Sequence, residues 1–324
     1  MKMGDFLGID TSNYTTSAAV YNSSKKLVVQ KKLPLLVKEG ELGLRQSDAV
    51  FHHTRHLPKI FEELFLNGIR IDAVAASDRP TEAEGSYMPC FLSGLGAARQ
   101  LAAAMRLPLM RFSHQQGHVA AAAYGANRVD LLDGEFIAFH VSGGTTDGLI
   151  VTPDDHTIIS CERVAGSLDL KAGQLVDRVG LMLGLKFPAG SELEKLALKS
   201  TGGYGPKPAL KAGWCSLSGI ENQCRSLYEK GADSAEIAHF CISGILAAVD
   251  GMTSFLIEQY PNRPIVYSGG VMSNSIIRKV IEDKYGGFFA PPEYSSDNAV
   301  GIALLAALKS ERRDFCAGNH DKPA

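Results

Sequence analysis

Residues 6–20 read FLGIDTSNYTTSAAV, and residues 136–150 repeat the same pattern as FIAFHVSGGTTDGLI. In each stretch an apolar strand pattern ends in a turn of small polar residues, and a second apolar pattern returns. A repeat at a domain-sized interval indicates internal duplication. The sequence therefore predicts two related lobes, each of which opens with a β-hairpin.

Helical and strand patterns alternate outward from these two hairpins, which predicts an α/β fold. Helices are expected at 52–67, 94–105, 172–183, 192–199, 235–258 and 299–308, and strands at 73–77, 108–112 and 264–268. We predict an N-terminal lobe of residues 1–128, completed by a C-terminal helix at 297–310, and a second lobe of residues 129–296. The polar segment 311–324 is expected to be a flexible tail.

The bulk composition favours a soluble protein with two cores, because a chain of 324 residues exceeds the size at which one core stops growing. The net charge of -2 gives no general attraction to nucleic acid, so an RNA partner would need local patches or helper proteins. The six cysteines form no C-x-x-C pair, no leader pattern opens the chain, and no membrane span is expected. These features predict a cytoplasmic protein.

The motif Ser113-His114-Gln-Gln-Gly-His118 directly follows a predicted strand. Ser113 is a suitable helix cap, and residues four apart lie on one helical face, so His114 and His118 should project together. Two imidazoles placed this way can bind one divalent metal. Asp297, at a predicted loop-to-helix junction, is a candidate third ligand. Such a set leaves positions open on Zn, Fe or Mn, which suits catalysis better than a closed structural site.

A bare His-x-x-x-His pattern is more often a coincidence of packing than a metal site, and its position at a strand end is what favours the metal here. No glutamate follows His114, so the metalloprotease motif and its general base are absent. A second pair, His52 and His56 with His53 between them, lies on a segment rich in Arg and polar residues. A surface or packing role is favoured for that pair.

Glycine-rich turns give a second signal. Ser142-Gly-Gly144 lies in the second hairpin, and Ser268-Gly-Gly270 leads toward Asn274 between a strand and a helix. Glycines let the backbone approach phosphate oxygens, although such turns are common in α/β proteins for structural reasons. Asp177, on a predicted helix, is a candidate acceptor for ribose or adenine groups, with a solvated ion pair as the equal alternative.

In their order along the chain, these motifs resemble the tRNA N6-adenosine threonylcarbamoyltransferase family, formerly called O-sialoglycoprotein endopeptidase. The resemblance covers roughly residues 5–310, and the ordered combination is more specific than any single motif. It runs through the segments Gly8–Ser12, His114–His118, Val141–Gly144, Gly173–Arg178, Pro188–Gly190, Ser216–Gly219, Gly269–Asn274 and Ser296–Asn298.

The resemblance implies an actin-like ATPase fold of two RNase H-like lobes, with a ligand cleft between them. It implies a divalent metal, Fe or Zn, held by His114, His118 and Asp297. The nucleotide ligand would be threonylcarbamoyl-AMP or ATP, contacted by Ser142, Gly143, Gly144, Asp177, Gly190 and Asn274. The reaction would transfer the threonylcarbamoyl group to N6 of adenosine-37 in tRNA, and a related metal-free paralogue and other subunits would be partners.

The chain departs from the family pattern at several positions. Tyr14-Thr15 stands where the family carries an acidic pair, Thr145 replaces His or Asn, Gln174 replaces Glu, and Ser77-Asp-Arg-Pro80 replaces a Gly-Pro-Gly-Leu turn. Two alternatives therefore stay open. One is a non-catalytic, nucleotide-binding partner, against which the retained His114, His118 and Asp297 argue. The other is a carbamoyltransferase, ATPase or kinase of this fold that acts on another acceptor. Basic pairs such as Lys25-Lys26, Lys31-Lys32 and Arg278-Lys279 are more often solvated charge than an RNA surface.

Overall fold

The computed structural model describes residues 4–12, 14–36, 44–202 and 205–318, with the backbone alone for 313–318. Contacts divide the chain into two compact units. The first contains residues 1–134, 152–161 and 297–324, and the second contains residues 135–151 and 162–296. The predicted lobes, 1–128 with 297–310 and 129–296, differ from these units mainly at 129–134 and 152–161, which lie in the first unit.

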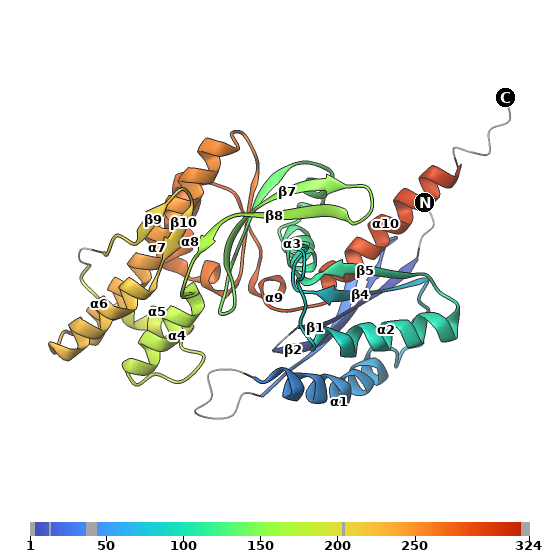
Figure 1. Ribbon diagram of the computed structural model, residues 1–324, viewed down its shortest axis with the longest axis horizontal. Coiled ribbons are helices and arrows are strands. Elements are labelled where there is room, and N and C mark those ends of the chain that lie inside the picture. Colours follow the sequence, from blue (N-terminus) through green and yellow to red (C-terminus); the bar gives the residue numbers. More distant parts are fainter. Residues whose placement is uncertain (1–3, 13, 37–43, 203–204, 319–324) are drawn as a thin grey trace. The chain divides into compact units, whose positions relative to one another are not determined.

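The first unit is a five-stranded sheet with helices on both faces (Figure 1). Strands β1, β2 and β3 are antiparallel, and β4 and β5 run parallel to β1, in the order β3-β2-β1-β4-β5. The elements are β1 (Asp5–Ser12), β2 (Thr15–Asn22), β3 (Leu27–Pro34), α1 (Gln46–Leu64), β4 (Ala73–Arg79), α2 (Phe91–Met105), β5 (Leu109–Ser113), α3 (His114–Gly125), η1 (Val129–Asp133) and α10 (Val300–Gly318).

Side chains alternate across β1, and this alternation assigns the helices to the two faces of the sheet. Ile9 lies against Gly94 of α2, whereas Gly8 faces Ala303 of α10. Because both faces are covered, β1 is buried from Phe6 to Ser12; its first part, Phe6–Ile9, is a continuous apolar run, and its end carries buried polar side chains. Its core includes Leu7, Ile9 and side chains of α1 and α2.

The second unit is a seven-stranded sheet in the order β12-β11-β6-β7-β8-β10-β9. The long helix α7 contributes much of its core. The elements are β6 (Phe136–Val141), β7 (Thr146–Asp154), β8 (Ile158–Ser167), α4 (Ala172–Met182), α5 (Gly190–Ala197), β9 (Ala209–Lys211), β10 (Trp214–Ser216), α6 (Ser218–Glu229), α7 (Ser234–Gln259), β11 (Ile265–Ser268), η2 (Gly270–Ser273), α8 (Ser275–Tyr285), β12 (Phe288–Phe289) and α9 (Pro292–Ser295).

The two sheets share one topology. Strands β8-β7-β6-β11-β12 follow the same order as β3-β2-β1-β4-β5, with β6 antiparallel to β7 and parallel to β11. The prediction of two related α/β lobes that each open with a hairpin is therefore confirmed. The short β9–β10 hairpin, which extends only the second sheet, was not predicted.

Other differences concern the lengths and number of elements. Sequence periodicity missed β3, β8, α6 and α8, and it ended the last helix at Leu308, whereas α10 continues to Gly318. The predicted flexible tail, 311–324, thus overlaps α10, and residues 319–324 lie outside the described part. Helix α7 is long and apolar enough to span a membrane, but 50% of its most apolar window is buried, as in a core helix.

Helices α3 and α10 approach each other through two glycines. A Cβ atom built on Gly301 would lie 1.9 Å from the carbonyl oxygen of Gly117, and one built on Gly117 would lie 2.9 Å from Ile302. Only hydrogen side chains permit backbones to come this close. The contact fixes the start of α10 beside the first turn of α3.

We predict that Gly301→Ala lowers the free energy of unfolding by about 1–3 kcal/mol or more, because the new methyl group meets backbone that cannot rotate away. The measurement is the midpoint of urea denaturation. The control is Gly96→Ala in α2, where nothing lies within 4 Å of the added Cβ. The control should be neutral or stabilising by up to about 1 kcal/mol. Equal effects of the two substitutions would contradict the close contact.

Candidate functional site

The two histidines of the predicted metal site lie in the first turns of α3. Ser113 caps this helix: its hydroxyl accepts from the Gln116 N–H at 3.1 Å, and the Gln116 side chain accepts from the Ser113 N–H at 2.8 Å. This reciprocal capping box fixes where the helix begins. The rings of His114 and His118 therefore lie together, with centroids 4.2 Å apart.

Asp297, just before α10, completes a cluster with these histidines. One ligand atom from each of the three residues lies within 4.8 Å of the others. Asp297 Oδ1 is 3.6 Å from His114 Nε2 and 3.3 Å from His118 Nε2. Ligands about 2.1 Å from a tetrahedral ion stand about 3.4 Å apart. The donor atoms thus have the chemistry and the spacing that a divalent ion requires.

A second layer of polar groups lies behind His114. The buried carboxylate of Asp10, near the end of β1, is 2.8 Å from His114 Nδ1 and accepts from the Ser77 hydroxyl at 2.5 Å. Sequence reasoning missed Asp10 and Ser77 as site residues. Their position near the ends of predicted strands could have identified them. The strands β1, β4 and β5 are parallel, so their carboxyl ends lie at one edge of the sheet, where ligand-binding side chains commonly gather.

The charges in this cluster are strongly coupled. Burial alone would lower the pKa of His114, but the carboxylates of Asp10 and Asp297 outweigh it and raise that pKa to about 10. Burial, followed by the charge of His114, lowers the pKa of His118. Burial opposes ionisation of Asp297, yet its hydrogen bonds to both histidines hold its pKa well below the usual range. The site therefore keeps its carboxylates charged at neutral pH.

In the second histidine group, His52, His53 and His56, the middle residue has a packing role. His53 is fully buried, and its Nδ1 lies 2.8 Å from the Thr16 hydroxyl, which is also 3.2 Å from Nδ1 of the part-buried His56. Burial lowers the pKa of His53 to about 4. His53 is thus a neutral core residue that ties α1 to β2.

The predicted nucleotide residues all lie in the second unit. Ser142, Gly143 and Gly144 form the turn between β6 and β7, closed by the Ser142 N–H donating to the Thr145 carbonyl at 2.7 Å. Gly173 of α4 donates to the Ser142 carbonyl at 3.0 Å, and a Cβ on Gly173 would lie 2.5 Å from the Gly143 nitrogen. Nothing lies within 4 Å of a Cβ on Gly143 or Gly144, so this turn is open on its outer side.

Helix α4 also carries Asp177, which accepts from the Ala189 N–H at 2.9 Å beside Gly190, the first residue of α5. Burial raises the pKa of Asp177. Asn274 caps α8, and its side-chain oxygen accepts from the N–H groups of Ile276 and Ile277. Helix α4 thus adjoins the glycine turn and Gly190. The Asn274 side-chain oxygen, in contrast, is already engaged in capping α8.

A cavity of about 330 Å³ lies between α4 and α6, away from the glycine turn residues named above. Its charged lining residues are Arg178, Arg225, Glu221 and Glu229, and Glu221 pairs with Arg178 at 3.0 Å and with Arg225 at 3.1 Å. Because two positive and two negative side chains line it, the cavity has no strong preference for an anion.

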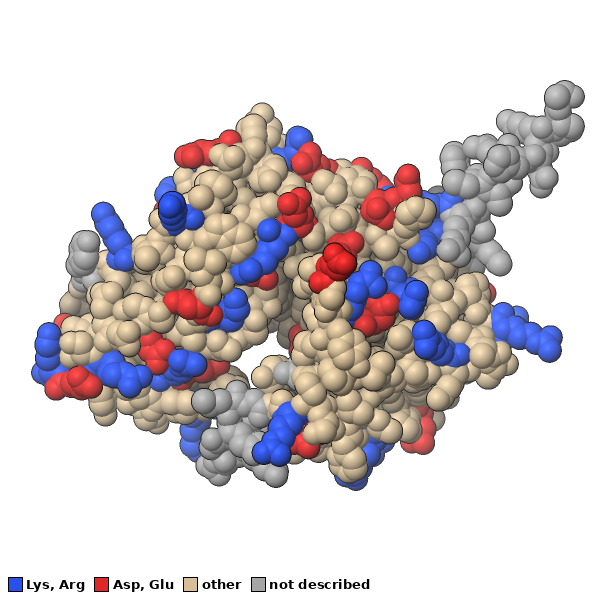
Figure 2. All heavy atoms as spheres, viewed as in Figure 1, with Lys and Arg blue, Asp and Glu red and all other residues tan. Residues whose placement is uncertain are grey.

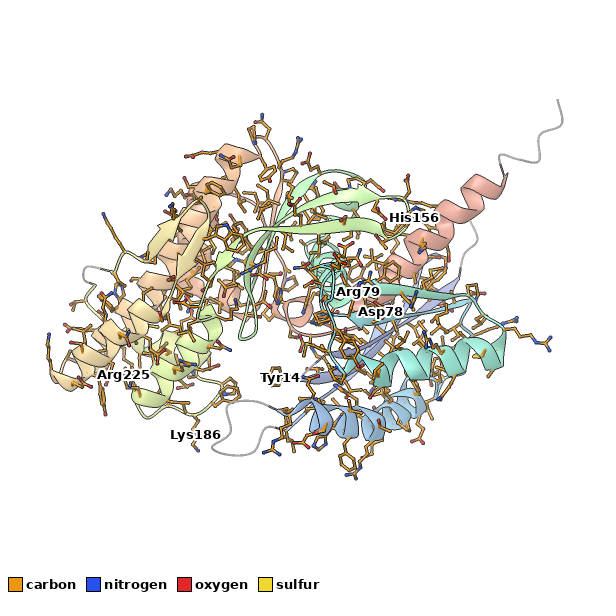
Figure 3. All side chains as sticks on the ribbon, in the orientation of Figure 1. Tyr14, Asp78, Arg79, His156, Lys186 and Arg225 are labelled. Carbon is orange, nitrogen blue, oxygen red and sulfur yellow. The ribbon has the colours of Figure 1, made fainter. Side chains whose placement is uncertain are left out.

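The departures from the family pattern are structurally visible. Tyr14, at the tip of the β1–β2 hairpin, is 40% exposed (Figure 3). Asp78 and Arg79 lie together near the end of β4, joined at 2.7 Å (Figure 3). Gln174 accepts from the Lys171 N–H at 3.3 Å in a helix cap. At these positions Asp78 and Gln174 thus make local ion-pair and capping contacts, whereas the Tyr14 side chain is exposed.

The fold is that of known two-lobed proteins. Full-length HypF, in its phosphate- and nucleotide-bound form, is similar with a TM-score of 0.59 at 16% identity, over 96% of this chain and 56% of that chain. A ROK family glucokinase from Streptomyces griseus, in complex with glucose and AMPPNP, is similar with a TM-score of 0.52 at 14% identity, over 94% and 100%. The duplicated sheets thus define a protein of the actin-like ATPase fold, with a His/His/Asp cluster in its first lobe.

The chain belongs to the tRNA N6-adenosine threonylcarbamoyltransferase family, a family of transferases whose sequence pattern matches residues 38–304. Relatives of that name from Streptococcus agalactiae serotype V and Thermotoga neapolitana are each 28% identical to it. The matches cover 98% of this chain and 96% of the first relative, and 95% of both chains for the second. A relative from Polynucleobacter asymbioticus is 30% identical over 94% of this chain and 91% of its own length.

We predict that, because of His53, the free energy of unfolding decreases as the pH is lowered from about 6.5 toward 4. The unfolded chain takes up a proton near the ordinary histidine pKa of 6.5, whereas folded His53 does so only near 4. Stability is therefore lost as pH falls from about 6.5 to 4, by up to about 2 kcal/mol between pH 7.5 and pH 5. Urea denaturation of the wild type and of His53→Gln across this range measures the effect. Parallel pH profiles for the two proteins would refute it.

Proposed function

We propose that this protein transfers a threonylcarbamoyl group from threonylcarbamoyl-AMP to N6 of adenosine-37 in tRNA, with the aid of a divalent ion. Membership of the threonylcarbamoyltransferase family supports the reaction. The single observation that carries the metal assignment is the convergence of His114, His118 and Asp297. These residues would hold Fe or Zn.

A bound ion would supply Lewis acidity toward the carbamoyl carbonyl or neutralise phosphate charge. The remaining chemistry belongs to the chain. Asp297, which its hydrogen bonds to both histidines keep ionised, would provide the negative ligand. The imidazoles would bind through Nε2, and His114, whose pKa is raised to about 10, would release a proton when the ion binds. No side-chain nucleophile is required, because the adenosine amine attacks the carbonyl directly and AMP leaves.

The nucleotide portion of the donor is assigned to the second unit. The open turn of Ser142, Gly143 and Gly144 offers backbone N–H groups at close approach, which suits phosphate oxygens. Asp177 and Gly190, joined through Ala189, would contact the nucleotide, as would Asn274 at the start of α8. ATP is the alternative ligand for the same groups.

The acceptor is expected to be held with help from partner subunits, among them a metal-free paralogue. On the face drawn in Figure 2, lysines and arginines are interspersed with acidic side chains. The net charge of -2 likewise provides no general attraction to a polyanion. We place the enzyme in the cytoplasm, because its proposed acceptor is tRNA and its five described cysteines are free thiols.

The test combines purified protein, with and without partner subunits, with threonylcarbamoyl-AMP and unmodified tRNA, and measures modified adenosine by mass spectrometry. We expect His118→Ala to lose the bound ion and to lower transfer at least about 100-fold. The matched control is His156→Ala, an exposed histidine in the β7–β8 turn (Figure 3), which should leave both unchanged.

Two outcomes would contradict the proposal. No transfer under any partner combination, despite bound ion and nucleotide, would favour a scaffold or another acceptor. Threonylcarbamoyl transfer that is undiminished in His118→Ala would show that the reaction does not depend on a metal at this site.

A further prediction separates the nucleotide site from the metal site. Gly143→Ala adds a methyl group on the open side of the turn, so we expect about tenfold or greater loss of ATP affinity with no change in unfolding midpoint. Gly173→Ala forces the same turn apart, so affinity and stability should both fall. Isothermal titration calorimetry and urea denaturation measure the two effects. Unchanged ATP affinity in both variants would place the nucleotide elsewhere.

A further inference from the structure

We propose that Asp10, held by Ser77, is the positioning residue that orients His114 so that its Nε2 atom faces the ion. This inference rests on the proposed metal site and goes beyond its ligands, because Asp10 reaches the ion only through His114. The carboxylate lies 2.8 Å from His114 Nδ1, on the opposite side of the ring from Asp297.

An imidazole has two nitrogens, and only one of them can bind the ion at this site. A carboxylate that accepts a hydrogen bond from Nδ1–H fixes the tautomer and the ring orientation, and it makes Nε2 a stronger donor. His114 Nε2 lies 3.6 Å from Asp297 Oδ1, so the nitrogen that does not contact Asp10 points at the candidate ligand set. Without Asp10, rotation of the ring would present the wrong nitrogen.

Asp10 is itself immobilised. Its Oδ1 atom accepts from the Ser77 hydroxyl at 2.5 Å, and its Oδ2 atom lies 3.2 Å from the Ser12 N–H. The side chain is fully buried on the central strand of the sheet. A buried carboxylate is costly unless its oxygens are paired, and here both have partners. Its position is therefore set by β1 and β4, and not by the loop that carries Asp297.

The second unit offers an internal comparison. His140 occupies the position in β6 that Asp10 occupies in β1, and Ser268 ends β11 as Ser77 lies near the end of β4. His140 Nδ1 is 3.0 Å from the Ser268 hydroxyl. In each unit, a serine thus forms a hydrogen bond with a polar side chain at the corresponding edge of that unit's own sheet. At these matched positions the first unit has the carboxylate of Asp10, which His114 of α3 contacts, whereas the second unit has the imidazole of His140.

The experiment measures Zn²⁺ affinity by competition with a chromophoric chelator, and the visible spectrum of the Co²⁺-loaded protein. We expect Asp10→Asn to weaken Zn²⁺ binding about 10–100-fold and to alter the Co²⁺ bands, and Ser77→Ala to do so less strongly. The matched control is Asp5→Asn at the start of the same strand, where the carboxylate pairs with Asn22. The control should bind both ions as the wild type does.

A second measurement is independent of the ion. In ion-free wild-type protein labelled with ¹⁵N-histidine, the His114 ring proton on Nδ1 should exchange slowly with solvent, and this protection should vanish in Asp10→Leu. An unprotected Nδ1 proton, or Zn²⁺ affinity that is unchanged in Asp10→Asn, would overturn the inference. Wild-type protein that binds no ion but keeps the protected proton would instead count against the proposed metal site, while supporting the Asp10–His114 contact.

Discussion

The close approach of Gly117 in α3 and Gly301 in α10 is the contact on which the candidate metal centre depends. It joins a helix from the first third of the chain to one from its end, and it does so at backbone distance, since the two glycines offer no side chain to hold the helices apart. His114 and His118 project from one of these helices, and Asp297 lies three residues before the first residue of the other, Val300. A bulkier residue at either glycine would push the two helices apart. It would thereby separate Asp297 from the two histidines without changing any of these three side chains.

The order of strands in the first sheet also brings charged side chains together. Strands β1, β4 and β5 are parallel neighbours, so Asp10, Ser77 and His114 meet where these strands end. Burial would ordinarily suppress such charges, but each carboxylate has an imidazole partner that keeps it ionised. The site is therefore a compact network in which ligand geometry and protonation state are set together.

The duplicated architecture separates two tasks. In the first unit, the strand ends carry carboxylate and imidazole groups with metal-ligand spacing. In the second unit, the equivalent strand ends lead into glycine turns, and nothing lies within 4 Å of a Cβ built on Gly143, Gly144 or Gly270. On the proposed function, the same topology would serve cation binding in one lobe and anion binding in the other. The departures at Tyr14, Thr145 and Gln174 fall in turns and in a helix cap, outside the strands of both sheets.

The sequence by itself determined the two hairpins, most helices, the α/β class and the helical pairing of His114 with His118, because these depend on local periodicity and capping. The ordered motifs also indicated the family. The sequence analysis did not identify β3, whose side chains are mostly exposed, or α8, which buries Ile277 and Ile281 among mostly polar residues, or the full length of α10. The roles of Asp10, Ser77 and His53 were decided by tertiary structure alone. Each acts through a partner distant in sequence, and only the strand order and the packing of α1 and α3 determine which partner that is.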